Sequence, residues 1–307
     1  MDIRADIHDA RFNEIIDLDA GLETVVTGFK FTEGPIWHPG EASLIFSDIL
    51  GNSIFRWCGD AGLEMLRRNS YMANGNAYDR VGRVVTCEHA TSRLVRWSPA
   101  SIDVNTNEGL EVLASTYEGK QLNSPNDVIV ARDGVIYFTD PTSGRSAGYG
   151  VPREPDLDHS GVYRLDPKTG ALTLLVTDFA KPNGLCFSRD ETRLFVNDTD
   201  RMHIRVFDVL ENGQLTGGNI WAETRGVGAG VPDGMKIDSD DNIYCCGPGG
   251  VHLFDADGVA LGVIRIPEQA ANFAFGDADL CSLYITASTT LYRVRVLVPG
   301  HPTFPFA

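Results

Sequence analysis

Residues 125–141, PNDVIVARDGVIYFTDP, read as two short strands joined by a tight turn. After Pro125 come two polar residues, Asn126 and Asp127, although the remainder is rich in Val, Ile, Tyr and Phe. Asn and Asp favour turns for local reasons. The same pattern returns along the chain, however, and its recurrence decides the fold.

Six stretches share this pattern. Each begins with a carboxylate or amide, runs through a short apolar segment, turns on Gly, Asp, Asn or Pro, and resumes as an apolar strand. Their opening residues are Glu33, Asn74, Asn126, Asn183, Asp233 and Asn272, at spacings of 41, 52, 57, 50 and 39. A period of about 40–50 residues with about four strands per unit is typical of a β-propeller. The sequence therefore predicts an all-β fold, a six-bladed β-propeller with an axial metal site.

An outer strand is expected in every unit, shortly after the second one. These six segments are 53–57, 93–97, 161–166, 204–209, 250–255 and 291–296. The segment 22–28, LETVVTG, is expected to pair with the last blade and close the ring, which removes exposed sheet edges. We predict one propeller domain over residues 21–298, an N-terminal extension over 1–20 and a C-terminal tail over 299–307.

The composition excludes several classes of partner. The net charge of −16 repels nucleic acid and anionic membrane surfaces. No apolar run approaches the ~18 residues that a membrane-spanning helix needs, and the N-terminus does not resemble a signal peptide. The six cysteines form no CxxC pair. We expect a cytoplasmic protein with reduced thiols that acts on a small molecule; the oligomeric state is left open.

Equivalent positions of a propeller meet near its axis, so the six opening residues should form one ring. Carboxylates crowded into a buried channel need a neutralising partner. Oxygen ligands from Asp, Glu and Asn suit a hard divalent cation such as calcium, magnesium or manganese. The competing interpretation is that the Asn-Gly and Asp-Gly pairs at 74–75, 183–184 and 233–234 are hairpin turns.

Other polar residues have weaker signals. The second-strand acids Asp48, Glu88, Asp140 and Asp198 are expected to anchor loops or blades rather than to bind the cation. His89 either reaches the mouth of the channel or anchors a loop. The insertion 142–161, rich in Gly, Pro and charge, is predicted to be a functional loop.

Eight ordered motifs carry a family resemblance: EGPIW, GRVVTCEH, SPNDVIV, GVIYFTDP, PNGLCFS, VPDGMKID, GPGGV and LYITA. From about Phe31 to Leu291 the sequence resembles the regucalcin/gluconolactonase family of six-bladed propeller metallohydrolases. TCEH and the GPGG after the fifth unit are similar to its bacterial gluconolactonase branch. Animal regucalcins have an Arg where this chain has Ser124, so a different sugar contact is expected there.

The resemblance implies one divalent cation, Ca²⁺ first and Mg²⁺, Mn²⁺, Zn²⁺ or Fe²⁺ as alternatives. It implies Glu33, Asn183 and Asp233 as ligands, with Asn126 completing the site or touching substrate. Asp233 is the expected catalytic base. A carboxylate bound to a cation is a weaker base, so Asp127 is the alternative.

The implied reaction is hydrolysis of a sugar lactone, such as glucono-1,5-lactone, to the aldonic acid. Expected substrate contacts are Asn74, Asn126, Asp127, His89 and Asn272, with Ser143, Arg145 and Tyr149 from the 142–161 loop. Two alternatives remain: a phosphotriesterase-like hydrolase using the same cation, and a metal-binding propeller without catalysis.

Overall fold

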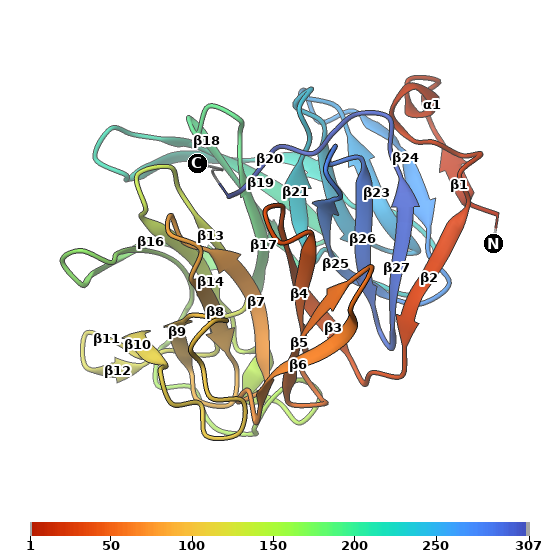
Figure 1. The fold of residues 1–307 in the computed structure, drawn as a ribbon. Coiled ribbons are helices and arrows are strands. Elements are labelled where there is room, and N and C mark those ends of the chain that lie inside the picture. The colour runs from red at the N-terminus through yellow and green to blue at the C-terminus, as the bar shows by residue number, and fades with distance from the viewer. Residues whose placement is uncertain (1, 305–307) are drawn as a thin grey trace.

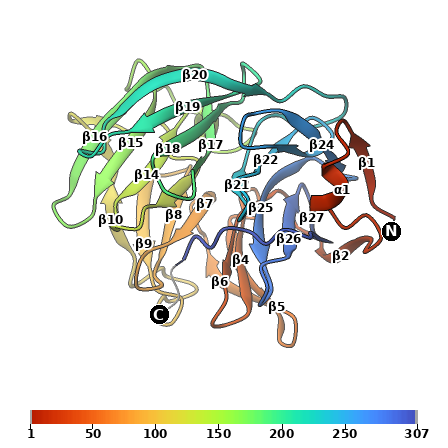
Figure 2. The same ribbon diagram turned by 90° about the horizontal axis from the view of Figure 1, so that it is seen from above.

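Six antiparallel sheets surround a common centre in the computed structural model, which describes residues 2–304 (Figures 1 and 2). Blades one and two are β3 (Thr32–His38), β4 (Ser43–Asp48), β5 (Ser53–Cys58), β6 (Gly62–Arg68), then β7 (Ala73–Tyr78), β8 (Val84–Glu88), β9 (Arg93–Trp97) and β10 (Glu111–Ala114). Blades three and four are β13 (Val128–Val130), β14 (Ile136–Asp140), β15 (Ser160–Asp166), β16 (Ala171–Phe179), then β17 (Pro182–Phe187), β18 (Arg193–Asp198), β19 (His203–Val209) and β20 (Leu215–Glu223).

The last two blades also contain strands from the N-terminal part of the chain. Blade five is β21 (Met235–Ile237), β22 (Ile243–Gly247), β23 (Gly250–Phe254) and β24 (Ala260–Arg265), with β1 (Arg4–Ile7) as a fifth, outer strand. Blade six is β25 (Ala270–Gly276), β26 (Ser282–Ala287) and β27 (Thr290–Arg295), completed by β2 (Leu22–Thr27). The predicted six-bladed propeller and its ring closure through 22–28 are confirmed.

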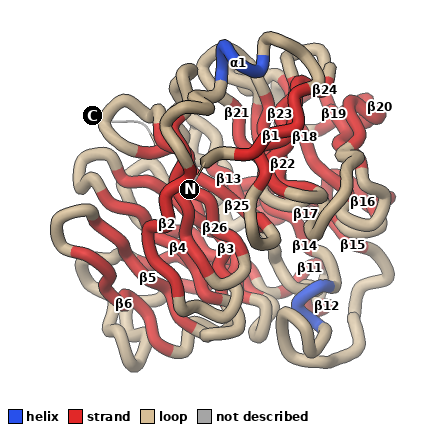
Figure 3. Tube along the Cα trace, turned by 90° about the vertical axis from the view of Figure 1, so that its right-hand side faces the viewer, coloured by secondary structure: helices blue, strands red, loops and turns tan. Residues whose placement is uncertain are grey.

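Helical structure is scarce in the described chain. Figure 3 shows the helix α1 (Phe12–Ile15) and the 3-10 turn η1 (Ser143–Arg145) among strands and loops. A small hairpin of β11 (Thr116–Tyr117) and β12 (Lys120–Gln121) lies apart from the blades. None of the helices among the described residues is long and apolar enough to cross a membrane.

The six segments expected as outer strands are the third strands β5, β9, β15, β19, β23 and β27, and a fourth strand lies outside each of them. The tight turn in the opening stretch is also present, since the Ala131 and Gly134 backbones pair across it and Gly134 has a φ of 90°. Glycine adopts that φ without the steric cost of a Cβ atom.

The hydrophobic core lies between neighbouring sheets, because each sheet packs both of its faces. All six residues of β4, SLIFSD, are therefore buried. One cluster joins blades two and three through Val85, Cys87, Val128 and Phe138. The first blade packs in the same way on the last, where Trp37 stacks on Tyr284 at 5.4 Å. The second strands thus read as apolar runs rather than as alternating patterns.

The predicted terminal segments contact the propeller. In the 1–20 extension, α1 buries Phe12 and Ile15 against blades five and six. In the 299–307 tail, the Phe304 ring contacts the rings of His38 and Tyr78, and the His301 amide donates to the Ile237 carbonyl. Residues 1 and 305–307 lie outside the described part of the chain.

Candidate metal centre and active site

The six opening residues lie at equivalent places near the centre of the ring. In blades one, two, four and six, Glu33, Asn74, Asn183 and Asn272 belong to the inner strand, at or next to a shift in strand register. In blades three and five, Asn126 and Asp233 come two residues before the inner strand. Register shifts of this kind re-aim a side chain out of the regular ladder. All six side chains are buried, with residue exposures between 2% and 8%.

The glycine after four of these residues is required by the neighbouring blade. A Cβ atom at Gly34 would lie 2.1 Å from the Asn74 carbonyl oxygen, and one at Gly184 would lie 2.0 Å from that of Asp233. Gly75 and Gly234 meet the next blade in the same way. The Asn-Gly and Asp-Gly pairs therefore mark close approach of the inner strands at the axis, and the hairpin-turn interpretation is wrong for all three pairs.

Polar side chains on the second strands donate hydrogen bonds to the backbone of three of the six opening residues. Ser47 Oγ donates to the Asn74 carbonyl at 2.7 Å, and Thr139 Oγ1 donates to the Asn183 carbonyl at 2.8 Å. The Asn197 amide donates to the Asp233 carbonyl. Each bond joins one blade to the next. These three residues were not predicted, although each directly precedes a second-strand acid.

The Asn74 amide is held by His89, which is 1% exposed. His89 Nδ1 lies 2.8 Å from the carbonyl oxygen of Tyr149, an acceptor, so Nδ1 carries the proton. Nε2 then accepts from Asn74 Nδ2 at 3.1 Å, which leaves Asn74 Oδ1 free to accept from another group. Burial lowers the pKa of His89 to about 4, so the imidazole of His89 is neutral at pH 7. His89 thus both anchors the loop and contacts the ring of polar residues.

Asn183 is oriented by a similar chain of hydrogen bonds. Its Nδ2 donates to Thr199 Oγ1 at 3.1 Å, and Thr199 Oγ1 donates to the Pro232 carbonyl at 2.7 Å. The amide nitrogen is therefore occupied, and the Asn183 oxygen remains available as a ligand.

Asn272 has the opposite orientation. Its Oδ1 accepts from Lys236 Nζ at 3.1 Å and from the Phe273 amide at 2.9 Å, while its Nδ2 donates to Glu33 Oε2 at 3.1 Å. The Gly34 amide donates to the same Glu33 oxygen at 2.6 Å. Asn272 is consequently a donor to a carboxylate, and its oxygen is not free to bind a cation.

Three carboxyl groups in this region have raised pKa values. Burial, followed by repulsion from Asp127, raises the pKa of Glu33 to about 7. Burial also raises the pKa of Asp233 well above its ordinary value, with further contributions from the charges of Glu33 and Asp127. Burial likewise raises the pKa of Asp127, and the positive charge of Lys236 opposes this rise. Buried acids of this kind are costly to ionise without a nearby cation.

The donors present fit a hard divalent cation. Asp127 Oδ2 is buried and has no hydrogen-bond partner within residues 2–304. Within the same residues, no three His, Cys, Asp or Glu side chains form a metal-binding group. A cation here would therefore need amide oxygens from Asn126 and Asn183 beside the carboxylates of Glu33 and Asp233, which is oxygen-only chemistry.

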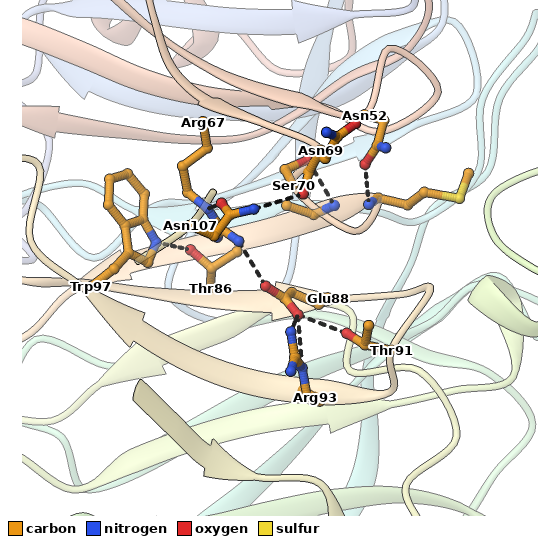
Figure 4. Close-up of polar contacts among 12 residues, drawn as sticks. Asn52, Arg67, Asn69, Ser70, Thr86, Glu88, Thr91, Arg93, Trp97 and Asn107 are labelled. Atoms are coloured by element: carbon orange, nitrogen blue, oxygen red, sulfur yellow. Dashed lines mark hydrogen bonds and ion pairs between the residues drawn. The ribbon is translucent and has the colours of Figure 1, made fainter. Parts of the chain in front are cut away.

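The second-strand acids anchor loops, as expected. Asp48, Asp140 and Asp198 each accept two or more backbone N–H groups from the segment before the inner strand or the turn after their own. Glu88 instead binds the Arg67 guanidinium at 2.9 Å and that of Arg93 at 2.7 Å, and it also accepts from Thr91 (Figure 4).

The 142–161 loop is fixed to blades two and three by two arginines. Arg145 is 7% exposed, and its guanidinium donates to the carbonyls of Asn123 and Leu122. Arg153 donates to the His89 carbonyl at 2.6 Å. The expectation that Arg145 contacts substrate is therefore wrong, because its donors are used inside the protein.

Tyr149 is the residue of this loop that approaches the ring of polar residues. Its aromatic ring contacts that of Phe31 at 5.1 Å, and its carbonyl accepts from His89. Burial and then the charge of Asp233 raise the pKa of its phenol. Ser143 is half-buried, and its carbonyl accepts from the Ser146 hydroxyl at 2.7 Å.

A cavity of about 450 Å³ lies at the opposite end of the channel. It is lined by the far ends of inner strands, including Tyr78, Val130 and Ile237, and by His301 and Pro302 of the C-terminal segment. Lys236 also borders it. The cavity is mainly apolar in its lining and does not contain the ring of acids and amides.

Residues 31–289 match the family described as the SMP-30/gluconolactonase/LRE-like region. A gluconolactonase from Zymomonas mobilis is 31% identical over 94% of this chain and 85% of its own length. A pentonolactonase from Haloferax volcanii is 28% identical over 91% of this chain and 96% of its own. The solved structure of a gluconolactonase from Xanthomonas campestris superposes with a TM-score of 0.85 at 34% identity, covering 95% of this chain and 94% of that one.

Proposed function

Because the chain belongs to the SMP-30/gluconolactonase/LRE-like family, we propose that it is a lactonase that opens a sugar lactone to the aldonic acid with the help of a divalent cation. Relatives of similar length that are a gluconolactonase and a pentonolactonase support a sugar lactone as substrate. We take glucono-1,5-lactone or a close aldonolactone as the substrate.

One observation carries this proposal: buried acids and amides from all six blades lie at equivalent places near the centre of the propeller. Glu33, Asn126, Asn183 and Asp233 would hold the cation, and Ca²⁺ is our first choice because every donor is an oxygen. When bound, the cation would polarise the lactone carbonyl and offset the negative charge that develops on its oxygen.

The residues of the chain supply the proton transfers. Asp233 takes a proton from the attacking water as the water oxygen bonds to the lactone carbonyl carbon. The bond from that carbon to the ring oxygen then breaks, and the proton passes to the departing ring oxygen. The products are one carboxylic acid and one hydroxyl group, so no covalent enzyme intermediate is needed.

Asp127 is the second candidate for the base. Its Oδ2 atom is buried without a hydrogen-bond partner among the described residues, and it is not one of the proposed ligands. A carboxylate that does not bind the cation retains more of its basicity. Both acids lie in the same channel, so only substitution separates their roles.

Neighbouring polar groups would position the sugar. Asn74 Oδ1 is free to accept from a sugar hydroxyl because His89 occupies the amide nitrogen. The Asn126 amide and the Tyr149 phenol are further candidates on the side of the 142–161 loop.

We propose a cytoplasmic location as well, since all six cysteines are free thiols.

The test is a comparison of two ester classes on one calcium-loaded preparation. Initial rates on a panel of aldonolactones and on phosphotriesters are followed with a pH indicator, after subtraction of spontaneous lactone opening. We expect kcat/KM for an aldonolactone to exceed that for any phosphotriester by at least about 100-fold. Phosphotriester turnover at a similar kcat/KM would refute the lactonase assignment, and calcium binding without turnover of either class would favour a non-catalytic propeller.

A further inference from the structure

Lys236 contacts the ring of acids and amides from the side of the apolar cavity. It follows Asp233 by three positions in the inner strand β21, and its Nζ atom lies 3.1 Å from Asn272 Oδ1 and 5.7 Å from the centroid of the Phe273 ring. The same residue borders the apolar cavity at the opposite end of the channel. Lys236 therefore separates that cavity from the candidate metal centre.

Asn272 links the ammonium group to a proposed ligand. Lys236 donates to the oxygen of the Asn272 amide, and the nitrogen of the same amide donates to Glu33 Oε2. The positive charge is thus two hydrogen bonds away from a carboxylate of the ring. It also acts on the pKa values of Glu33 and Asp127, opposing the effect of burial on each.

Two cations would consequently share one set of carboxylates. Glu33 and Asp233 would help to hold the divalent ion, while Asn272 links the ammonium group to Glu33 by hydrogen bonds. Charges of the same sign repel strongly in a buried channel, where water screens them little. Without the divalent ion, the ammonium group still offers a positive charge to Glu33 and Asp127.

We propose that Lys236 is a positioning residue that serves as a fixed counter-cation of the ring: it stabilises the metal-free site and weakens the binding of the divalent ion. The inference rests on the proposed function only for the identity of the site. It names a residue that sets the affinity of the cation, without making Lys236 a ligand or a contact of the substrate.

The experiment is a calcium titration by calorimetry of the full chain, previously stripped with a chelator. Lys236→Gln removes the charge and retains an N–H donor for Asn272, whereas Lys236→Arg retains the charge. We expect Lys236→Gln to bind Ca²⁺ about tenfold more tightly than the wild type, and Lys236→Arg to stay within about threefold of it. Equal or weaker binding by Lys236→Gln would overturn the proposal.

Thermal unfolding gives a second readout that a simple packing role would not produce. The metal-free Lys236→Gln protein should melt below the metal-free wild type, and saturating Ca²⁺ should raise its melting temperature by more than it raises that of the wild type. Equal calcium-induced shifts in the two proteins would contradict the proposal. Neither measurement uses a lactone, so loss of the lactonase assignment alone would leave this inference standing.

Discussion

Asn272 Nδ2 donates a hydrogen bond of 3.1 Å to Glu33 Oε2, although the two residues are 239 positions apart in the sequence. Glu33 lies in the first blade and Asn272 in the last, so the bond forms only when the ring is closed. Closure also depends on β2, which completes the last blade by pairing with β27. The candidate metal centre is thus a product of the whole propeller rather than of any one blade.

Removal of the divalent cation should abolish hydrolysis. Treatment with a chelator followed by dialysis is expected to reduce lactone turnover to the background rate, and added Ca²⁺ should restore it. The unfolding temperature should fall much less than activity, because blade packing supplies most of the stability. Full turnover in protein shown by metal analysis to contain no divalent ion would contradict the proposal.

Asp233→Asn retains the size of the side chain and one oxygen ligand while it removes the charge and the basicity. We expect kcat to fall by about 100-fold or more, the scale of losing a general base. Asp127→Asn is the matched comparison. If Asp233→Asn binds calcium and turns over near the wild-type rate while Asp127→Asn is inactive, Asp127 is the base.

Three asparagines of the ring should differ in their effect on calcium affinity. Asn183→Ala removes a proposed ligand oxygen and should weaken calcium binding by at least about tenfold. Asn74→Ala should leave the affinity within about threefold and raise KM, because Asn74 is assigned to the substrate. Asn272→Ala should change the calcium affinity mainly because it removes the hydrogen bond from Asn272 to Glu33. Calorimetric titration separates these cases, and an empty site in Asn74→Ala would show that the ligand assignment is wrong.

His89 should make stability depend on pH in a defined window. Its folded pKa is about 4, below the ordinary value of 6.5, so the unfolded chain binds a proton first as the pH falls. The neutral imidazole therefore contributes to the free energy of unfolding above pH 6.5. This contribution is lost progressively toward pH 4, by up to about 3 kcal/mol.

His89→Gln cannot titrate and is the control for all other groups. Urea unfolding of both metal-free proteins at several pH values between 7.5 and 4.5 gives the difference in their free energies of unfolding. That difference should move in favour of the variant by about 2–3 kcal/mol as the pH falls. Parallel pH profiles for the two proteins would contradict the assignment of a buried, neutral His89.

The number of blades, the four-stranded repeat and the closing strand could be predicted from the sequence. Local properties encode them: the apolar second strands, such as LIFSD at 44–48 and IYFTD at 136–140, recur at a near-constant distance from a polar residue. Recurrence at one register position also placed Glu33, Asn74, Asn126, Asn183, Asp233 and Asn272 near the axis, where the structure has them buried.

What each polar side chain does was decided by tertiary contacts. Asn74 and Asn272 are equivalent in the repeat, yet their side-chain amides have opposite orientations. The nitrogen of the Asn74 amide is bound to His89, whereas the oxygen of the Asn272 amide is bound to Lys236. Arg145 looked like a substrate contact from its place in the loop, but its donors are used by backbone carbonyls of the preceding segment. A repeat sets where a residue lies along its blade, whereas hydrogen-bond partners from other blades and from the loop set the direction of its donors and acceptors. Those partners come together only when distant segments fold side by side.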